Sequence, residues 1–267
     1  MDLPLEQLSS SWWLDHFRVN LEATPAIGWE SAGMLTAEER AAVAGSLRQF
    51  QIGEGAQGRG LMRRASRHPM RQGDEALPDA LGAFIREEQR HSEMLGRFLD
   101  REGIARAERH WVDDSFRFLR KLAGFELCMR VLAAAEIIAI PYYTALREAT
   151  GSAVLQGICD RVLRDEEAHL RFQASVLGRA AGGSPLPAIL ARLTFDQFFL
   201  EVTILVVWKE HRRVLKRGGY TWVRFRRECF QQQSLLQSRW LAIRSWLAAS
   251  GESNCRRMQP SVGLPPA

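Results

Sequence analysis

Apolar and polar residues alternate along this chain with the period of amphipathic α-helices. In long windows the apolar positions recur every three or four residues, and the two-residue alternation of a half-buried strand is absent. Glycine and proline residues interrupt the pattern between successive windows. The pattern predicts an all-α fold with long helices over residues 36–66, 79–102, 114–149, 152–180, 187–216 and 221–249.

The two ends of the chain differ from its middle. Residues 1–35 carry helix breakers and several tryptophans, which predict an N-terminal arm packed onto the helical body. Thr36 and Glu39 form a capping-box pattern that starts the first long helix. No linker rich in proline, glycine or serine divides residues 36–249, so we expect a single helical domain there. Residues 250–267 are expected to form a disordered tail.

The composition is that of an ordinary globular protein. Of the 267 residues, 46% are hydrophobic and 25% are charged, and this length suffices to bury a large core. No uncharged apolar run reaches the roughly 18 residues of a membrane-spanning helix, and the start lacks the pattern of a secretory signal. The four cysteines are far apart and form no CxxC pair, which argues against a disulfide framework or a zinc ribbon. We therefore expect a cytoplasmic protein.

The net charge of +5 does not point to nucleic acid. Most of the basic residues are arginines, and they are spread over every segment beside acidic residues, as on solvated helix faces. Nucleic-acid binding requires a clustered basic face. We expect neither a nucleic-acid partner nor a membrane partner.

Two Glu-x-x-His motifs carry the candidate chemistry. The first joins Glu88 to His91, and the second joins Glu166 to His169. Residues three apart share one face of a helix. Each motif therefore directs a carboxylate and an imidazole toward the same point.

Two further glutamates sit inside apolar helical stripes. Glu54 follows Leu47 and Phe50 on one face, and Glu136 lies among alanines and isoleucines. A lone buried carboxylate costs several kcal/mol unless it is paired or binds a metal. Two Fe²⁺ ions neutralise four carboxylates and leave both histidines uncharged. The sequence therefore predicts a metal centre with ligands Glu54, Glu88, His91, Glu136, Glu166 and His169.

The order Glu, Glu-x-x-His, Glu, Glu-x-x-His resembles the ferritin-like di-iron carboxylate superfamily. The resemblance covers about residues 36–180, and the wording around both motifs is similar to its bacterial oxygenases and desaturases. It implies a four-helix bundle with a crossover connection, to which the helices over 187–216 and 221–249 are added. It also implies that Glu88 and Glu166 bridge the two metals.

The same resemblance implies partners for the two histidines. In the superfamily an acidic residue just before a ligand glutamate often accepts a hydrogen bond from the histidine of the other motif. Asp165 would then orient His91, and Glu87 would orient His169. Tyr143 shares a face with the lone glutamate of its own helix. It is either a hydrogen-bond or electron donor near the metals, or an ordinary core tyrosine.

Small residues near Glu54 predict room beside the site. Gly55 and Gly58 lack side chains, which leaves space for either a substrate or a closely packed helix. Ala133 and Ile140 lie on the stripe of the other lone glutamate. We expect these four residues to line a substrate cavity.

A di-iron site of this kind predicts an oxygenase or oxidase. The expected reaction is O₂-dependent hydroxylation, N-oxygenation or desaturation of a small organic or acyl substrate. Manganese, or a mixed Mn/Fe pair, is an alternative to two iron ions. N-oxygenases of the superfamily carry an extra histidine where this chain has Val162, which weakens that assignment. The chain has no flavin, nicotinamide or Fe–S motif, so we expect a separate electron donor or reductase.

Other functions remain open at this point. A ferroxidase, iron-storage or peroxide-scavenging protein is the main alternative, and a metal-free helical interaction protein is the weakest. The apolar run over 198–208 favours a homodimer unless the monomer itself buries it. His211, near the end of the same helix, is expected to face solvent or helix carbonyls.

Overall fold

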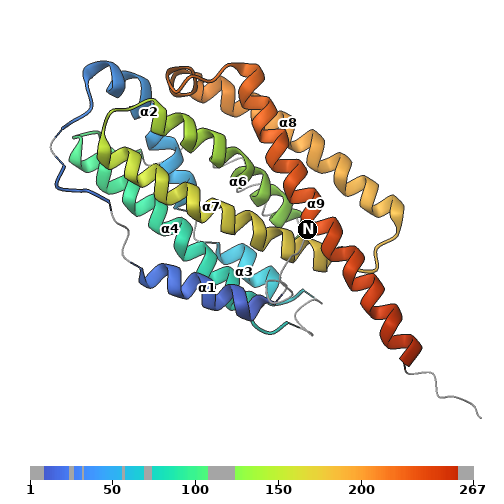
Figure 1. The fold of residues 1–267 in the computed structure, drawn as a ribbon. Helices are drawn as coiled ribbons and strands as arrows, with labels where there is room; N and C mark the ends of the chain where they lie inside the picture. The colour runs from blue at the N-terminus through green and yellow to red at the C-terminus, as the bar shows by residue number, and fades with distance from the viewer. Residues whose placement is uncertain are drawn as a thin grey trace, which may run out of the picture.

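The computed structural model describes residues 9–23, 27–31, 33–55, 58–68, 74–107 and 124–257, with side chains as far as residue 250. Within these residues every regular element is a helix, so the predicted all-α fold is confirmed. Figure 1 shows the helices along the chain. They are α1 (Ser10–Glu22), α2 (Ala37–Glu54), α3 (Arg59–Ala65), α4 (Leu77–Arg101), α6 (Phe125–Glu148), α7 (Ala153–Ala180), α8 (Leu186–Arg217) and α9 (Trp222–Arg257).

Four of these helices form the central bundle. α2 packs against α4, α6 packs against α7, and α4 and α7 join the two pairs. α8 and α9 lie outside the bundle and cover α6 and α7 (Figure 1). Burial of the apolar faces of α4, α6 and α7 holds the bundle together. This arrangement matches the predicted four-helix bundle with two added C-terminal helices.

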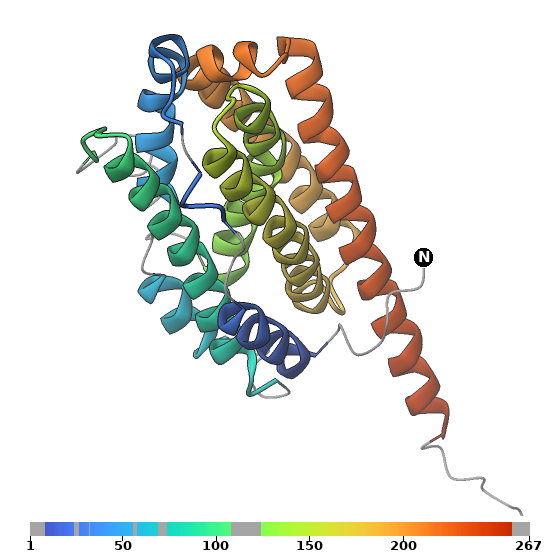
Figure 2. The same ribbon diagram turned by 60° about the vertical axis from the view of Figure 1, so that its left-hand side comes forward.

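The N-terminal segment is a helix that lies against α4. α1 is capped by Ser9, whose hydroxyl accepts a hydrogen bond from the backbone of Trp12. Its buried face carries Trp13 and Phe17, which pack onto the bundle. Figure 2 shows α1 crossing α4 at one side of the bundle. The expected arm therefore has a regular structure with a defined docking face.

The expected single helix over 36–66 is wrong. α2 ends at Glu54, and α3 begins at Arg59. Gly58 adopts the left-handed conformation, with φ of 57°, which favours glycine. A Cβ atom there would lie 2.1 Å from Cδ1 of Ile85 on α4. The turn therefore needs glycine both for its backbone angle and for its close approach to α4.

Other helix ends differ less from the prediction. α9 continues to Arg257, past the expected end at 249, because a single glycine costs only about 1 kcal/mol and does not by itself stop a helix. α6 begins at Phe125 after the extended Gly124, and residues 114–123 of the expected helix lie outside the described residues. No helix of the described part is both long enough and apolar enough to cross a membrane.

The turn between α8 and α9 provides a test of this packing. A Cβ atom at Gly218 would lie 2.0 Å from the backbone oxygen of Ala145 on α6. We expect Gly218→Ala to lower the free energy of unfolding by about 1–3 kcal/mol, because the helices must separate to admit the methyl group. Gly45→Ala is the matched control, since nothing lies within 4 Å of a Cβ atom there. It should stabilise the protein by about 0.4–1 kcal/mol. Urea denaturation of both variants measures the difference, and equal effects would contradict the described packing.

Candidate metal centre

The predicted ligands converge inside the bundle, with each of its four helices contributing. All but one of the six residues are buried, and the side chain of Glu88 is 13% exposed. α2 supplies one glutamate from its last position, α6 supplies one from its middle, and α4 and α7 each supply a Glu-x-x-His pair. The residues brought together are Glu54, Glu88, His91, Glu136, Glu166 and His169.

The six side chains form two overlapping groups. One group, in which ligand atoms lie within 4.8 Å of one another, contains Glu54, Glu88, His91 and Glu166. The other, with the same spacing, contains Glu88, Glu136, Glu166 and His169. Glu88 and Glu166 belong to both groups. This arrangement suits two neighbouring ions that share these two carboxylates.

A carboxylate of the opposite motif holds each histidine. Nε2 of His91 lies 2.9 Å from Asp165, and Nε2 of His169 lies 3.0 Å from Glu87. A carboxylate accepts hydrogen bonds, so in each ring Nε2 carries the proton and donates it. In the neutral imidazole, Nδ1 then has a free lone pair. Both Nδ1 atoms are directed toward the glutamates of the centre.

The centre contains buried polar atoms that lack hydrogen-bond partners. These atoms are Nδ1 of both histidines, Oε1 of Glu88 and both carboxylate oxygens of Glu166. Nδ1 of His169 lies only 2.9 Å from Oε1 of Glu88, and Nδ1 of His91 lies 3.8 Å from the same oxygen. Facing lone pairs at such distances repel unless a cation or a proton lies between them. These orphaned atoms fit a pair of bound metal ions.

In the absence of metal, protons must lie between these facing lone pairs. Burial raises the pKa of Glu88 well above its usual value, and the neighbouring Glu136 and Glu54 raise it further. Burial and the same glutamate, Glu136, also raise the pKa of Glu166. Burial by itself lowers the pKa of His169, but the surrounding carboxylates outweigh it and raise that pKa well above the usual value. The metal-free centre therefore retains protons that metal ions would displace.

The charges around the histidines balance without any metal. Arg161 bonds Asp165 at 2.9 Å, and Arg90 lies 3.4 Å from Asp165 and 3.7 Å from Glu87. Burial opposes ionisation of Asp165, but hydrogen bonds and charge from His91, with Asn20 and Arg161, lower its pKa. Two arginines thus offset the two outer carboxylates. Among the described residues, Glu88 and Glu166 lie beside the two histidines and not beside an arginine. Two divalent ions would match the charge of the four inner glutamates.

Two further side chains hold the terminal glutamates. The hydroxyl of Tyr143 donates a hydrogen bond of 2.7 Å to Glu54, and Nε2 of Gln173 donates one of 3.0 Å to Glu136. Burial, followed by the charge of Glu54, raises the pKa of Tyr143 well above its usual value, so the phenol keeps its proton. For Tyr143, the structure thus places the predicted hydrogen bond at the centre. Gln173 was missed, although it lies one helical turn after His169.

The four residues expected to line a substrate cavity differ from one another in their surroundings. A Cβ atom at Gly55 would lie 3.0 Å from Oγ of Ser92, and Ile85 fills the space at Gly58. At Gly58 the missing side chain therefore serves a closely packed helix, not an open cavity. Ala133 is buried and Ile140 is half-buried. Their role in a cavity stays a prediction.

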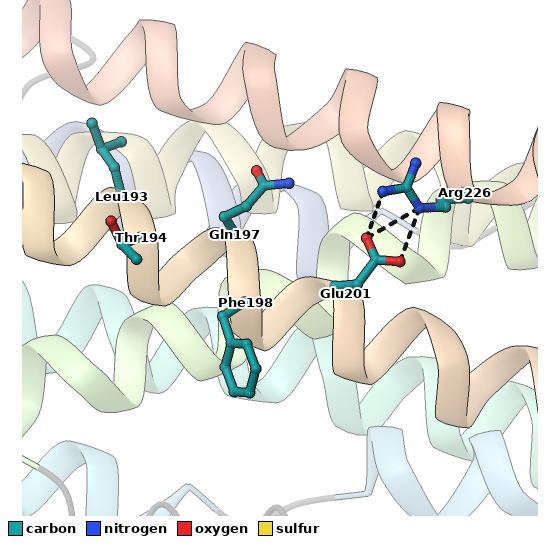
Figure 3. A pocket seen from close by; sticks show the side chains of 6 residues that line it. All are labelled: Leu193, Thr194, Gln197, Phe198, Glu201 and Arg226. Atoms are coloured by element: carbon teal, nitrogen blue, oxygen red, sulfur yellow. Dashed lines mark hydrogen bonds and ion pairs between the residues drawn. The ribbon is translucent and has the colours of Figure 1, made fainter.

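The described pockets lie elsewhere, on the outer face of α8 and α9. Figure 3 shows one of them, in which the Arg226 guanidinium pairs with the Glu201 carboxylate, while the Phe198 ring points away from this pair. A second pocket on the same face extends along α9 around Trp222 and Phe230. Neither pocket is lined by a residue of the metal centre or by an expected cavity residue.

His211 is buried, contrary to the expectation that it faces solvent. Its Nδ1 lies 2.8 Å from Oγ of Ser46, and that hydroxyl also bonds Tyr142 at 2.7 Å. Phe50 stacks on Tyr142 and contacts the His211 ring edge to face. α8 covers α2 and α6 at this point, which removes the histidine from solvent.

Comparison with known proteins identifies the fold. No family model matches the sequence, and no curated protein matches it. A solved structure of a variant of the R2-like ligand-binding oxidase with aerobically reconstituted Mn/Fe cofactor matches 89% of this chain and 94% of its own, with TM-score 0.61 and 17% identity. The same oxidase with aerobically reconstituted Mn/Fe cofactor, after a long soak, matches with TM-score 0.56, 17% identity and coverage of 89% and 93%. This chain therefore has the ferritin-like fold of these oxidases.

The raised pKa of Glu166 predicts a pH-dependent stability. The folded, metal-free protein holds this proton more tightly than the unfolded chain, whose carboxyl has the usual value of 4.5. Stability therefore falls as the pH rises above 4.5, and Glu166→Gln removes that loss. We expect the variant to melt at a higher temperature than wild type at neutral pH, and to lose this advantage in acid.

Melting curves in the presence of a chelator measure this difference across the pH range. Glu167→Gln is the matched control, because Glu167 is an exposed neighbour on the same helix that pairs with exposed Arg171. Its melting temperature should follow wild type at every pH. A Glu166→Gln advantage that does not change with pH would contradict the charge repulsion described here.

Proposed function

We propose that this chain is a di-metal oxidase that holds two iron ions, or one manganese and one iron, and reduces O₂ while oxidising a small organic or acyl substrate. The observation that carries the proposal is the set of buried, unpaired lone pairs on His91, His169, Glu88 and Glu166. The two nearby arginines, Arg90 and Arg161, pair with Glu87 and Asp165. The likeness in fold to oxidases with a Mn/Fe cofactor supports the same reading.

The residues suggest how the two ions would be held. Glu54 and His91 would bind one ion, Glu136 and His169 would bind the other, and Glu88 with Glu166 would bind both. When bound, such a pair supplies electrons for the reduction of O₂ and a Lewis acid for its products. Iron and manganese both accept this set of oxygen and nitrogen ligands.

The protein supplies orientation and a dry environment. Each histidine ring is fixed by a carboxylate behind it, and Tyr143 fixes Glu54 through its hydroxyl. Phe84 contacts the His169 ring at 4.7 Å between centroids, and Phe17 packs behind both at 6.0 Å from the same ring. These buried aromatic rings exclude water from one side of the centre.

The proposed reaction is hydroxylation or desaturation. Hydroxylation and desaturation are favoured over N-oxygenation, because the fully buried Val162 occupies the position where the N-oxygenases have an extra histidine. A separate reductase would supply the electrons. Two copies of the chain would associate through the apolar outer face of α8, where Phe198 and Leu205 are exposed.

Metal stoichiometry tests the proposal. We expect the metal-free protein to bind two Fe²⁺ per chain without oxygen, as measured by titration and mass spectrometry. Glu88→Ala should abolish tight binding of both ions, because Glu88 belongs to both ligand groups. Glu136→Ala should abolish only one, because Glu136 belongs to a single group.

Other outcomes separate the alternatives. Uptake of many irons per chain after admission of O₂ would indicate iron storage in place of an oxidase. A wild-type protein that binds neither iron nor manganese would overturn the metal centre. O₂ consumption by the two-iron protein, followed with an oxygen electrode, then provides the assay for a substrate screen.

The Tyr143 hydroxyl gives a second test. Tyr143→Phe removes the donor to Glu54 and should weaken Fe²⁺ binding at the Glu54 group by about tenfold or more, because a hydrogen bond to a charged group contributes about 1.5–3 kcal/mol. Binding at the other group should not change. Tyr142→Phe is the control, because the Tyr142 hydroxyl bonds Ser46 and not a ligand. Equal losses in both variants would show that the effect comes from packing alone.

A further inference from the structure

Asn20 of α1 contacts both carboxylates that hold the histidines. Its side-chain nitrogen lies 2.5 Å from Oε1 of Glu87 and 3.0 Å from Oδ1 of Asp165. These two carboxylates come from α4 and α7, on opposite halves of the bundle, and they are 0% and 4% exposed. One amide group therefore bonds both of the carboxylates that hold the histidines of the two Glu-x-x-His motifs.

The orientation of the Asn20 amide follows from its partners. A primary amide has two N–H donors on nitrogen and one acceptor oxygen. Both donors meet carboxylate oxygens, and the oxygen accepts a hydrogen bond of 2.6 Å from Arg161. The reverse orientation would place the amide oxygen against two carboxylates and the amide nitrogen against a guanidinium. Every hydrogen-bonding group of the side chain is therefore used in a single arrangement.

The backbone of Asn20 is also held at this point. Near the C-terminus of α1, carbonyl groups lack partners within the helix. Arg90 donates a hydrogen bond of 2.7 Å to the Asn20 carbonyl, and Arg161 donates one of 3.3 Å. The last turn of α1 has no basic residue of its own, so α4 and α7 supply the positive charge that this helix end favours. The same two arginines neutralise Glu87 and Asp165.

We propose that Asn20 is a positioning residue for the metal centre, which fixes Glu87 and Asp165 at once and thereby sets the orientation of both histidine ligands. The proposal rests on the metal-binding function proposed above. Without the amide, each carboxylate loses a donor on the side away from its histidine. Both rings then gain freedom to rotate about the bonds that direct Nδ1 inward.

This arrangement links α1 to metal binding. Binding favours the histidine orientation that the docked α1 stabilises, so by reciprocity bound metal stabilises the docking of α1. A single contact serves both halves of the centre. Loss of that contact should therefore weaken both metal sites together, unlike the loss of Tyr143.

The test uses Mn²⁺ as the probe on the full chain. Anaerobic titration, with the free ion followed by electron paramagnetic resonance, gives two dissociation constants. We expect Asn20→Ala to raise both Mn²⁺ dissociation constants by about 10–100-fold, which is the usual effect of removing a residue that orients the metal ligands. Asn20→Asp keeps the shape of the side chain but replaces its donors with a negative charge. It should weaken binding at least as much as Asn20→Ala, whereas a residue that only fills space would tolerate it.

Ser10→Ala is the matched control for the docking of α1. Ser10 lies at the other end of the helix, bonds Asp74, and accepts a hydrogen bond of 2.9 Å from Arg179. The Ser10→Ala variant should lower the melting temperature of the metal-free protein without changing either Mn²⁺ constant. Circular dichroism establishes that each variant is folded before titration. Asn20→Ser, which retains one donor and should give an intermediate loss, replaces Asn20→Ala if that protein does not fold.

The outcomes separate this inference from the proposed function. Unchanged Mn²⁺ constants in Asn20→Asp, or a change in only one constant, would overturn the role of Asn20 and leave the metal centre intact. The same loss in Ser10→Ala would assign the effect to the docking of α1 as a whole. A wild-type chain that binds no Mn²⁺ and no Fe²⁺ would overturn the proposed function, and this inference with it.

Discussion

Four carboxylates packed against two imidazoles in the interior impose the central constraint on this structure. Such a cluster is costly to bury, because charges of the same sign repel in a medium of low dielectric constant. The raised pKa values of Glu88 and Glu166 reflect that cost in the metal-free protein. The rest of the bundle must be stable enough to hold these groups together. The extensive apolar burial along α4, α6 and α7 provides that stability.

The surroundings of the centre are organised in layers that differ in charge. Inside, within the described part of the chain, Glu88 and Glu166 lie beside histidines and not beside arginines. Outside, Glu87 and Asp165 are neutralised by Arg90 and Arg161, and Asn20 satisfies the oxygens that remain. Glu87 and Asp165 thus hold the Nε2 atoms of both histidines while their own charge is paired with arginines. The unbalanced charge is thus confined to the place where two divalent ions would neutralise it.

The sequence predicts the parts of the centre that depend on local spacing. A Glu-x-x-His motif shares one helix face wherever the helix lies, and a glutamate in an apolar stripe is buried once that helix packs. Asn20 has no such signal, because its partners are 67 and 145 residues away along the chain. The helix end at Glu54 was also missed, since glycine is tolerated in helices and only the structure shows the left-handed backbone of Gly58 and its contact with Ile85. His211 was misjudged for the same reason, because α2 and α6 bury it.

The break after Glu54 makes the two ligand groups unequal. Glu136 projects from the middle of a continuous helix, and Gln173 of the neighbouring helix fixes its carboxylate. Glu54 is the last residue of α2, and Gly55 caps the helix end. Tyr143, on a different helix, fixes its carboxylate instead. Glu54 is thus held at a helix end by a tertiary hydrogen bond, whereas Glu136 has helical turns of α6 on both sides.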